Sequence, residues 1–77
     1  MEIQFLGTGT SFGVPEIGCQ CPVCISSDAR DKRLRCSIWV RQGPLSLAVD
    51  TPPDFRYQCL RAGITRLDAV LLTHLHA

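Results

Sequence analysis

The chain has 77 residues, a formal net charge of +1 and a hydrophobic content of 45%. This length allows at most one small domain, which buries about 60% of the surface that its unfolded chain exposes. The composition is that of a globular core and not of a disordered tail. The near-neutral charge provides no overall field for nucleic acid or an acidic membrane surface, so neither is expected as a partner.

The sequence also bears on location. No apolar stretch approaches the roughly 20 residues that span a bilayer, and the segment 1–4 lacks the basic start and apolar run of a secretory signal. We therefore expect a cytoplasmic protein. The five cysteines agree with this, because an odd number without an export signal is more typical of metal ligands than of disulfides.

The first predicted strand runs from Glu2 to Leu6, where Ile3 and Phe5 alternate with polar residues. A glycine-rich loop follows, with the sequence Gly7-Thr8-Gly9-Thr10-Ser11-Phe12-Gly13. Its spacing misses the dinucleotide-binding fingerprint by one residue, and the Gly-Lys-Ser/Thr of a Walker loop does not follow. A turn between strands is therefore favoured over a phosphate cradle.

Three cysteines lie close together in the next segment, Cys19-Gln20-Cys21-Pro22-Val23-Cys24. A turn at Gly18 and Pro22 would bring their thiolates to three corners of a zinc tetrahedron. Structural zinc sites are closed, so a fourth ligand is needed, either Cys36 or a histidine or cysteine after residue 77. The alternatives are buried or free thiols and a redox pair at Cys21 and Cys24.

The segment 26–35 is polar and contains four of the eight basic residues, offset in part by Asp28 and Asp31. A guanidinium can contact phosphate, but a solvated loop or short helix is the more common structure of such a run. We expect the loop or short helix here.

A hairpin is predicted next, from strands over 36–42 and 45–50 joined by Gly43-Pro44. Cys36 shares a face with the apolar residues of its strand, so a core position is favoured over a ligand role. Asp50 ends the second strand. A buried carboxylate there needs a partner, which predicts a metal ligand or a hydrogen bond to a ligating histidine. A turn or helix-capping role is the alternative.

A helix is predicted over about 53–62, with Phe55, Cys59 and Leu60 on its packed face and Gly63 as its stop. Cys59 is then expected to be packed and inert. The helix leads into a final strand.

The apolar run 70–72 predicts a strand buried on both faces, and it breaks into Thr73-His74-Leu75-His76. Side chains at i and i+2 of extended backbone lie on one side, so His74 and His76 can bind one metal ion such as zinc. Ordinary polar histidines at a strand end are the alternative. A catalytic zinc usually has three protein ligands, so further ligands would lie after Ala77 or in another chain.

The Thr-His-x-His run resembles the start of the Thr-His-x-His-x-Asp-His motif of the metallo-β-lactamase superfamily of metallohydrolases. The Gly-Thr-Gly loop, Gly13-Val14-Pro15 and the cysteine cluster are similar to the phosphoribosyl cyclic phosphodiesterase branch. This resemblance implies an α/β fold: the N-terminal part of an αββα sandwich, mostly strands, with a zinc-binding loop and one clear helix. Residues 1–77 would form the N-terminal portion of one such domain, including a cysteine-rich zinc-binding insertion at 14–36.

The same resemblance implies the roles of the candidate site residues. Cys19, Cys21 and Cys24 would bind a structural zinc together with a distant histidine.

His74 and His76 would bind the first catalytic metal, zinc or manganese, and Asp50 would be the catalytic-site aspartate that supports it. In the full-length enzyme, a dinuclear centre would activate hydroxide to hydrolyse a cyclic or small phosphodiester. The chain alone is expected to be inactive, because it lacks the second half of that centre.

Two other functions are left open. One is a zinc-stabilised binding or assembly module in which only the cysteines hold metal. The other is a protein of the pyrroloquinoline quinone biosynthesis type, a branch with a similar cysteine cluster. Since half of a sandwich leaves sheet edges and an uncovered core, we also expect a homodimer or pairing with the remaining polypeptide.

Overall fold

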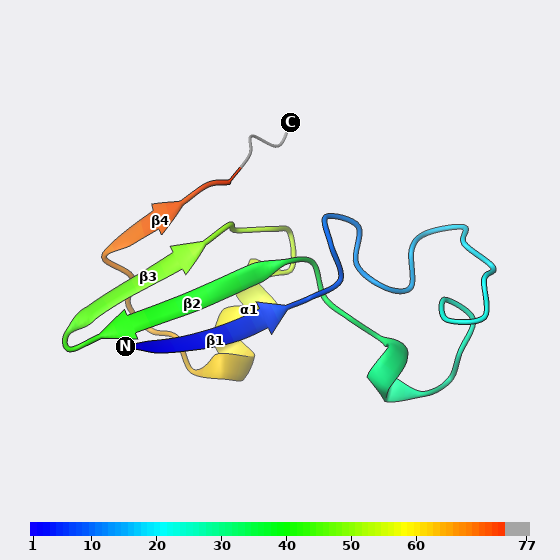
Figure 1. Cartoon of the computed structure of the whole chain (residues 1–77), viewed down its shortest axis with the longest axis horizontal. Helices are drawn as coiled ribbons and strands as arrows, with labels where there is room; N and C mark the ends of the chain where they lie inside the picture. Colours follow the sequence, from blue (N-terminus) through cyan, green and yellow to red (C-terminus); the bar gives the residue numbers. More distant parts are fainter. Residues whose placement is uncertain (74–77) are drawn as a thin grey trace.

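The structure is a computed structural model that describes residues 1–73. It contains a four-stranded sheet and one α-helix (Figure 1). The elements are, in chain order, β1 (Glu2–Gly7), the 3-10 helix η1 (Ala29–Asp31), β2 (Ser37–Gln42), β3 (Leu45–Val49), α1 (Phe55–Ala62) and β4 (Ala69–Leu71). Each strand and the helix predicted from the sequence is confirmed, with bounds that differ by one or two residues.

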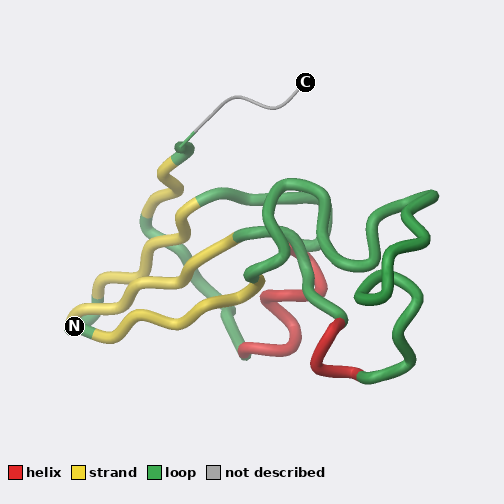
Figure 2. Tube along the Cα trace, turned by 45° about the vertical axis from the view of Figure 1, so that its right-hand side comes forward, coloured by secondary structure: helices red, strands yellow, loops and turns green. Residues whose placement is uncertain are grey.

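The strands lie in the order β1-β2-β3-β4. The pairs β1/β2 and β2/β3 are antiparallel, and the turn at Gly43-Pro44 joins the latter into the expected hairpin. The pair β3/β4 is parallel. A parallel neighbour requires a crossover connection, which is supplied here by the segment 50–68 with α1 in it (Figure 2).

One face of the sheet forms the core. Leu6, Ser37, Trp39 and Ala48 are all buried, and α1 contacts β1 and lies behind the sheet in Figure 1. The Trp39 indole donates a hydrogen bond to the hydroxyl of Ser46 at 2.9 Å. The polar end of the indole is therefore satisfied inside the core, as a buried tryptophan requires.

The opposite face is apolar and largely uncovered within the described part of the chain. The strand registers place on it one residue set: Ile3, Phe5, Ile38, Val40, Leu47, Val49, Ala69 and Leu71.

The prediction that β4 is buried on both faces is wrong, because Val70 is 43% and Leu71 is 55% exposed. The physical reason is that, within residues 1–73, β4 pairs with β3 alone, while the helix packs against β1 at the opposite edge of the sheet.

Helix α1 ends where the sequence predicts. Gly63 has a left-handed backbone (φ +76°), and its N–H donates to the carbonyl of Cys59. The predicted packed face is partly wrong, since Leu60 is 65% exposed and the buried side chain is Gln58. The amide of Gln58 donates to the Arg35 carbonyl at 2.8 Å. A hydrogen bond to a neighbouring loop thus selects the buried face, which hydrophobic spacing could not reveal.

The segment 8–36 extends from one end of the sheet (Figure 1). An antiparallel bridge between Val14 and Arg33 closes its base, with both N–H···O distances at 2.8 Å. The glycine-rich loop is a turn, as predicted, and packs against residues 33–36. Gly7 is required there because a Cβ would lie 2.2 Å from the Arg35 carbonyl oxygen.

Within residues 1–73, no helix is long and apolar enough to cross a membrane.

Candidate metal centre

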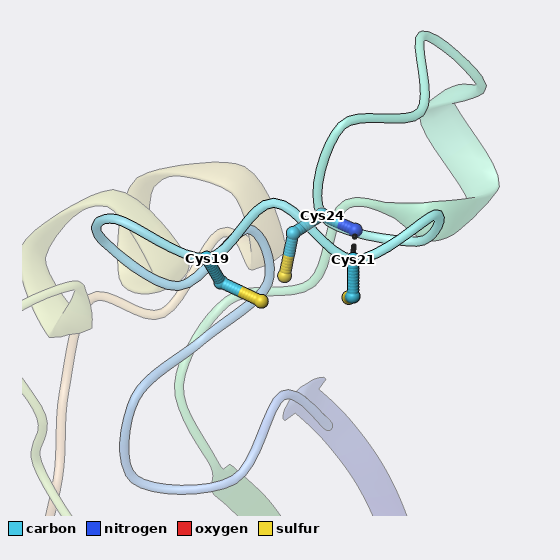
Figure 3. A group of neighbouring side chains, drawn as sticks. All are labelled: Cys19, Cys21 and Cys24. Carbon is cyan, nitrogen blue, oxygen red and sulfur yellow. Dashed lines mark hydrogen bonds between the residues drawn. The ribbon is translucent and has the colours of Figure 1, made fainter.

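The three clustered cysteines come together in the loop, as the sequence predicts (Figure 3). Their sulfur atoms all lie within 4.8 Å of one another. Gly18 has a φ of +80°, and the Cys19 N–H donates to the Glu16 carbonyl at 3.0 Å, so a tight turn precedes the cluster. Cys21 is exposed, whereas Cys19 and Cys24 are half-buried.

Backbone N–H groups point at the sulfur atoms. The Cys24 N–H lies 3.5 Å from Sγ of Cys21, and the Glu16 N–H lies 3.5 Å from Sγ of Cys24. The N–H of Cys24 and the side chain of Cys19 lower the pKa of Cys21 to about 7. The N–H of Glu16 acts likewise on Cys24, but the neighbouring Cys19 thiol and burial outweigh it and raise that pKa. One thiolate is therefore favoured near neutral pH, which suits a metal ligand.

These three thiols fit a zinc ion. Zinc–thiolate bonds of about 2.3 Å in a tetrahedron place the sulfur atoms about 3.8 Å apart, which agrees with a cluster confined within 4.8 Å. A metal bound by three thiolates is open at its fourth position. Within residues 1–73 no other histidine, cysteine or carboxylate joins the cluster.

Cys36 is not brought to the cluster, and its predicted place in the core is also wrong. It is exposed and lies just before β2 begins. Its N–H donates to the Thr10 carbonyl at 2.8 Å, which draws the residue into the loop. The register of β1 and β2 shifts between Phe5 and Gly7, so the alternation of β2 does not extend back to position 36.

Cys59 is half-buried on α1, and burial raises the pKa of its thiol, as expected of an inert cysteine.

Asp50 lies at the end of β3, buried and in a left-handed backbone conformation (φ +64°). Its Oδ1 accepts a hydrogen bond from the Thr73 N–H at 2.9 Å, and its Oδ2 accepts one from the Thr73 hydroxyl at 2.6 Å. The Asp50 N–H donates to the Leu71 carbonyl, and the Asp50 carbonyl accepts from the Ser37 hydroxyl, both at 2.8 Å. The aspartate does not cap α1, because its carboxylate binds a residue after β4.

The two histidines predicted as catalytic metal ligands, His74 and His76, lie outside the described residues. Their role, and with it the catalytic role of Asp50, stays a prediction. The sequence reasoning missed Thr73 as the partner of Asp50. The available signal was that Asp50 and Thr73 each follow an apolar run that predicts a strand.

The fold and the thiol cluster together define a class: the N-terminal portion of a metallo-β-lactamase-type sandwich with a cysteine-rich metal-binding loop. Comparison with solved structures bears this out. A crystal structure of a diphosphatase from the PhnP family matches 97% of this chain at 53% identity, with a TM-score of 0.87. The predicted fold and the predicted resemblance are therefore confirmed.

A second structure, zinc-bound PqqB from Methylobacterium extorquens, is 28% identical over 96% of the chain, with a TM-score of 0.78. An octanoyltransferase of Porphyromonas gingivalis is 53% identical over 77 residues, or 99% of this chain. No family model matches the sequence.

The chain spans a minor part of each of these proteins. It covers 30% of the diphosphatase, 29% of PqqB and 16% of the octanoyltransferase. Most of the octanoyltransferase therefore lies outside the match.

Proposed function

We propose that this chain is the N-terminal part of a metal-dependent hydrolase, a phosphodiesterase acting on cyclic or small phosphodiesters. The observation that supports it most directly is the pair Asp50–Thr73, set in a fold that matches the PhnP-family diphosphatase. This pair ties the end of β3 to the residue that precedes His74. In open α/β sheets, ligands commonly bind beyond the carboxyl ends of the strands, and Asp50 and Thr73 follow the carboxyl ends of the parallel pair β3 and β4.

The residues have separate roles in this proposal. His74 and His76 bind zinc or manganese, and metal ions at such a centre polarise a phosphoryl oxygen and lower the pKa of water. Asp50 is a positioning residue, because its carboxylate accepts hydrogen bonds from the N–H and the hydroxyl of Thr73. Cys19, Cys21 and Cys24 hold a structural zinc that orders the loop. The remaining metal ligands belong to the rest of the protein, so residues 1–77 alone are inactive.

The test measures metal content by elemental analysis together with hydrolysis of bis(p-nitrophenyl) phosphate by the full-length protein. A His74→Ala/His76→Ala variant is expected to carry less metal than the parent and to lose turnover. A Cys36→Ser variant is the matched control, because Cys36 is exposed and lies outside the cluster. Unchanged metal content and turnover in the histidine variant would overturn the proposal.

A second candidate is the zinc-stabilised binding or assembly module. It is favoured by the convergence of the three thiols, whose sulfur atoms all lie within 4.8 Å of one another. This candidate predicts that metal is lost only when the cysteines are replaced.

A pyrroloquinoline quinone type of protein is the third candidate, supported by the match to PqqB. It predicts metal binding at the histidines without hydrolysis of phosphodiesters.

A further inference from the structure

A cavity of about 430 Å³ lies between α1 and the base of the cysteine-rich loop. Helix α1 contributes Tyr57 and Arg61, and the loop contributes Lys32, Arg33 and Pro15. None of these residues belongs to the cysteine cluster or to the Asp50–Thr73 pair. The volume is within the range of about 300–1,000 Å³ that is typical of small-molecule sites.

The cations of this cavity have no carboxylate partner within residues 1–73. Four of the eight basic residues form ion pairs, namely Arg30, Arg35, Arg41 and Arg66. The other four form none within residues 1–73, and three of those four line the cavity. Positive charge is thus concentrated at one concave place in a chain whose net charge is only +1.

Each of the three cations is held in place by one neutral acceptor. Arg33 donates to the Thr8 hydroxyl at 2.8 Å, and Arg61 donates to the Leu6 carbonyl at 2.8 Å. Lys32 donates to the Ser26 carbonyl at 3.0 Å. An arginine has five N–H donors and a lysine has three, so every one of these groups keeps donors for a ligand.

Asp28, the carboxylate on which the charge of Lys32 acts, is already paired with another residue. The side chain and N–H of Arg30 are the main causes that lower the pKa of Asp28, and the charge of Lys32 adds a smaller effect. The Asp28 carboxylate is nevertheless engaged by the Arg30 guanidinium at 2.8 Å. Lys32 therefore keeps its charge for another partner.

We propose that this cavity binds a nucleoside diphosphate. A single phosphate monoester carries about −1.5 to −2 charge near neutral pH, which would leave part of the three cations uncompensated, whereas two linked phosphates balance them. Tyr57 is 55% exposed, and the Arg61 guanidinium lies 5.5 Å from the centroid of its ring. This aromatic and cationic surface suits stacking of a nucleobase.

The test is isothermal titration calorimetry of the full-length protein with adenosine 5′-(α,β-methylene)diphosphate, whose diphosphate cannot be hydrolysed at the bridge. Lys32→Gln is expected to weaken binding about tenfold or more, because it removes a charge-assisted hydrogen bond. Arg56→Gln is the matched control, since Arg56 is exposed on α1, makes the same charge change and does not line the cavity. It should bind as the parent does.

A second variant tests whether the Tyr57 ring stacks on the nucleobase. Tyr57→Ala should weaken binding of the nucleotide analogue but leave binding of methylenediphosphonate unchanged. Equal affinity in the parent and Lys32→Gln, an equal loss in Arg56→Gln, or no binding to the parent would overturn the inference.

The His74→Ala/His76→Ala variant separates this inference from the proposed hydrolase. Unchanged binding in that variant supports a site at the cavity, even if hydrolysis is absent from the parent. Loss of binding in that variant would place the analogue at the strand end and overturn the inference while supporting the metal centre.

Discussion

The carboxylate of Asp50 accepts two hydrogen bonds from Thr73, one from the N–H at 2.9 Å and one from the hydroxyl at 2.6 Å. These residues are 23 positions apart in the chain. They meet because β3 and β4 are parallel neighbours and both end at the same edge of the sheet. Any loss of this pair should loosen the residue that precedes the first candidate metal ligand.

Asp50→Asn tests the pair with little change in shape. Asparagine tolerates the left-handed backbone found at this position, but its amide has one acceptor oxygen in place of two. The Thr73 hydroxyl must then turn to accept from the amide NH2, and two charge-assisted bonds become neutral ones, which should lower the free energy of unfolding by about 1–2 kcal/mol. Denaturant titration measures this change.

Turnover measurements distinguish a loss of positioning at the candidate metal site from a loss of folding stability. We expect Asp50→Asn to lower hydrolysis of bis(p-nitrophenyl) phosphate by the full-length protein even where it is fully folded. Thr73→Ser keeps the hydroxyl and should retain activity, whereas Thr73→Val should behave like Asp50→Asn. An active Thr73→Val variant would contradict the positioning role.

The cysteine loop should bind one zinc ion per chain. Replacing Cys21 by serine removes one of three converging thiolates, so that zinc equivalent should be lost in elemental analysis. Cys59→Ser is the control, because Cys59 lies on α1 outside the cluster. Equal zinc content in the two variants would place the metal elsewhere.

Thiol reactivity should distinguish the same cysteines in metal-free protein. The pKa of Cys21 is lowered to about 7, whereas burial raises the pKa of Cys59 above its ordinary value of 9.0. Since the thiolate is the nucleophile, Cys21 should be alkylated by iodoacetamide at pH 7 well before Cys59. Its rate should rise with pH through about 7 and then level off. Mass spectrometry of the labelled peptides reads both sites, and zinc should protect Cys21.

Asp68 should make stability depend on pH in acid. The Ser46 N–H donates to its carboxylate at 2.8 Å, and this bond and Arg66 lower its pKa below the ordinary 3.8. A lowered pKa in the folded state stabilises the fold above pH 3.8, and this stabilisation is lost as the pH falls through the folded-state value. Asp68→Asn should therefore weaken the dependence of unfolding on pH below about 4. Urea titrations that show the same pH dependence of unfolding in Asp68→Asn and in the parent would contradict this.

The uncovered face of the sheet should cause association of the isolated 77-residue chain. Phe5 is 65% and Ile3 is 59% exposed on that face, and exposed apolar patches of this kind promote contact with another chain. Phe5→Lys is expected to shift the chain toward monomer in size-exclusion chromatography. Leu60→Lys, at an equally exposed position on α1, is the control and should leave association unchanged.

Local patterns in the sequence predicted the strands, the helix and the cysteine cluster, because each depends on neighbours within a few residues. The misses all involve contacts between distant segments. Gln58 is buried by a bond to Arg35, and Cys36 is drawn outward by Thr10. Apolar run length predicted a doubly buried β4, but burial depends on what packs above and below the strand. His74 and His76 lie outside the described residues and are still predictions.

The parallel pairing of β3 and β4 also bears on the order in which the two candidate metal sites form. The three cysteines span six residues, so closing that loop costs little chain entropy and zinc can bind before the sheet is complete. Asp50 and Thr73 meet only after the segment between them, with α1, has folded across the sheet. Contacts so distant in sequence form slowly. We expect the thiolate site to take up its metal early during folding, while the strand-end site becomes competent last.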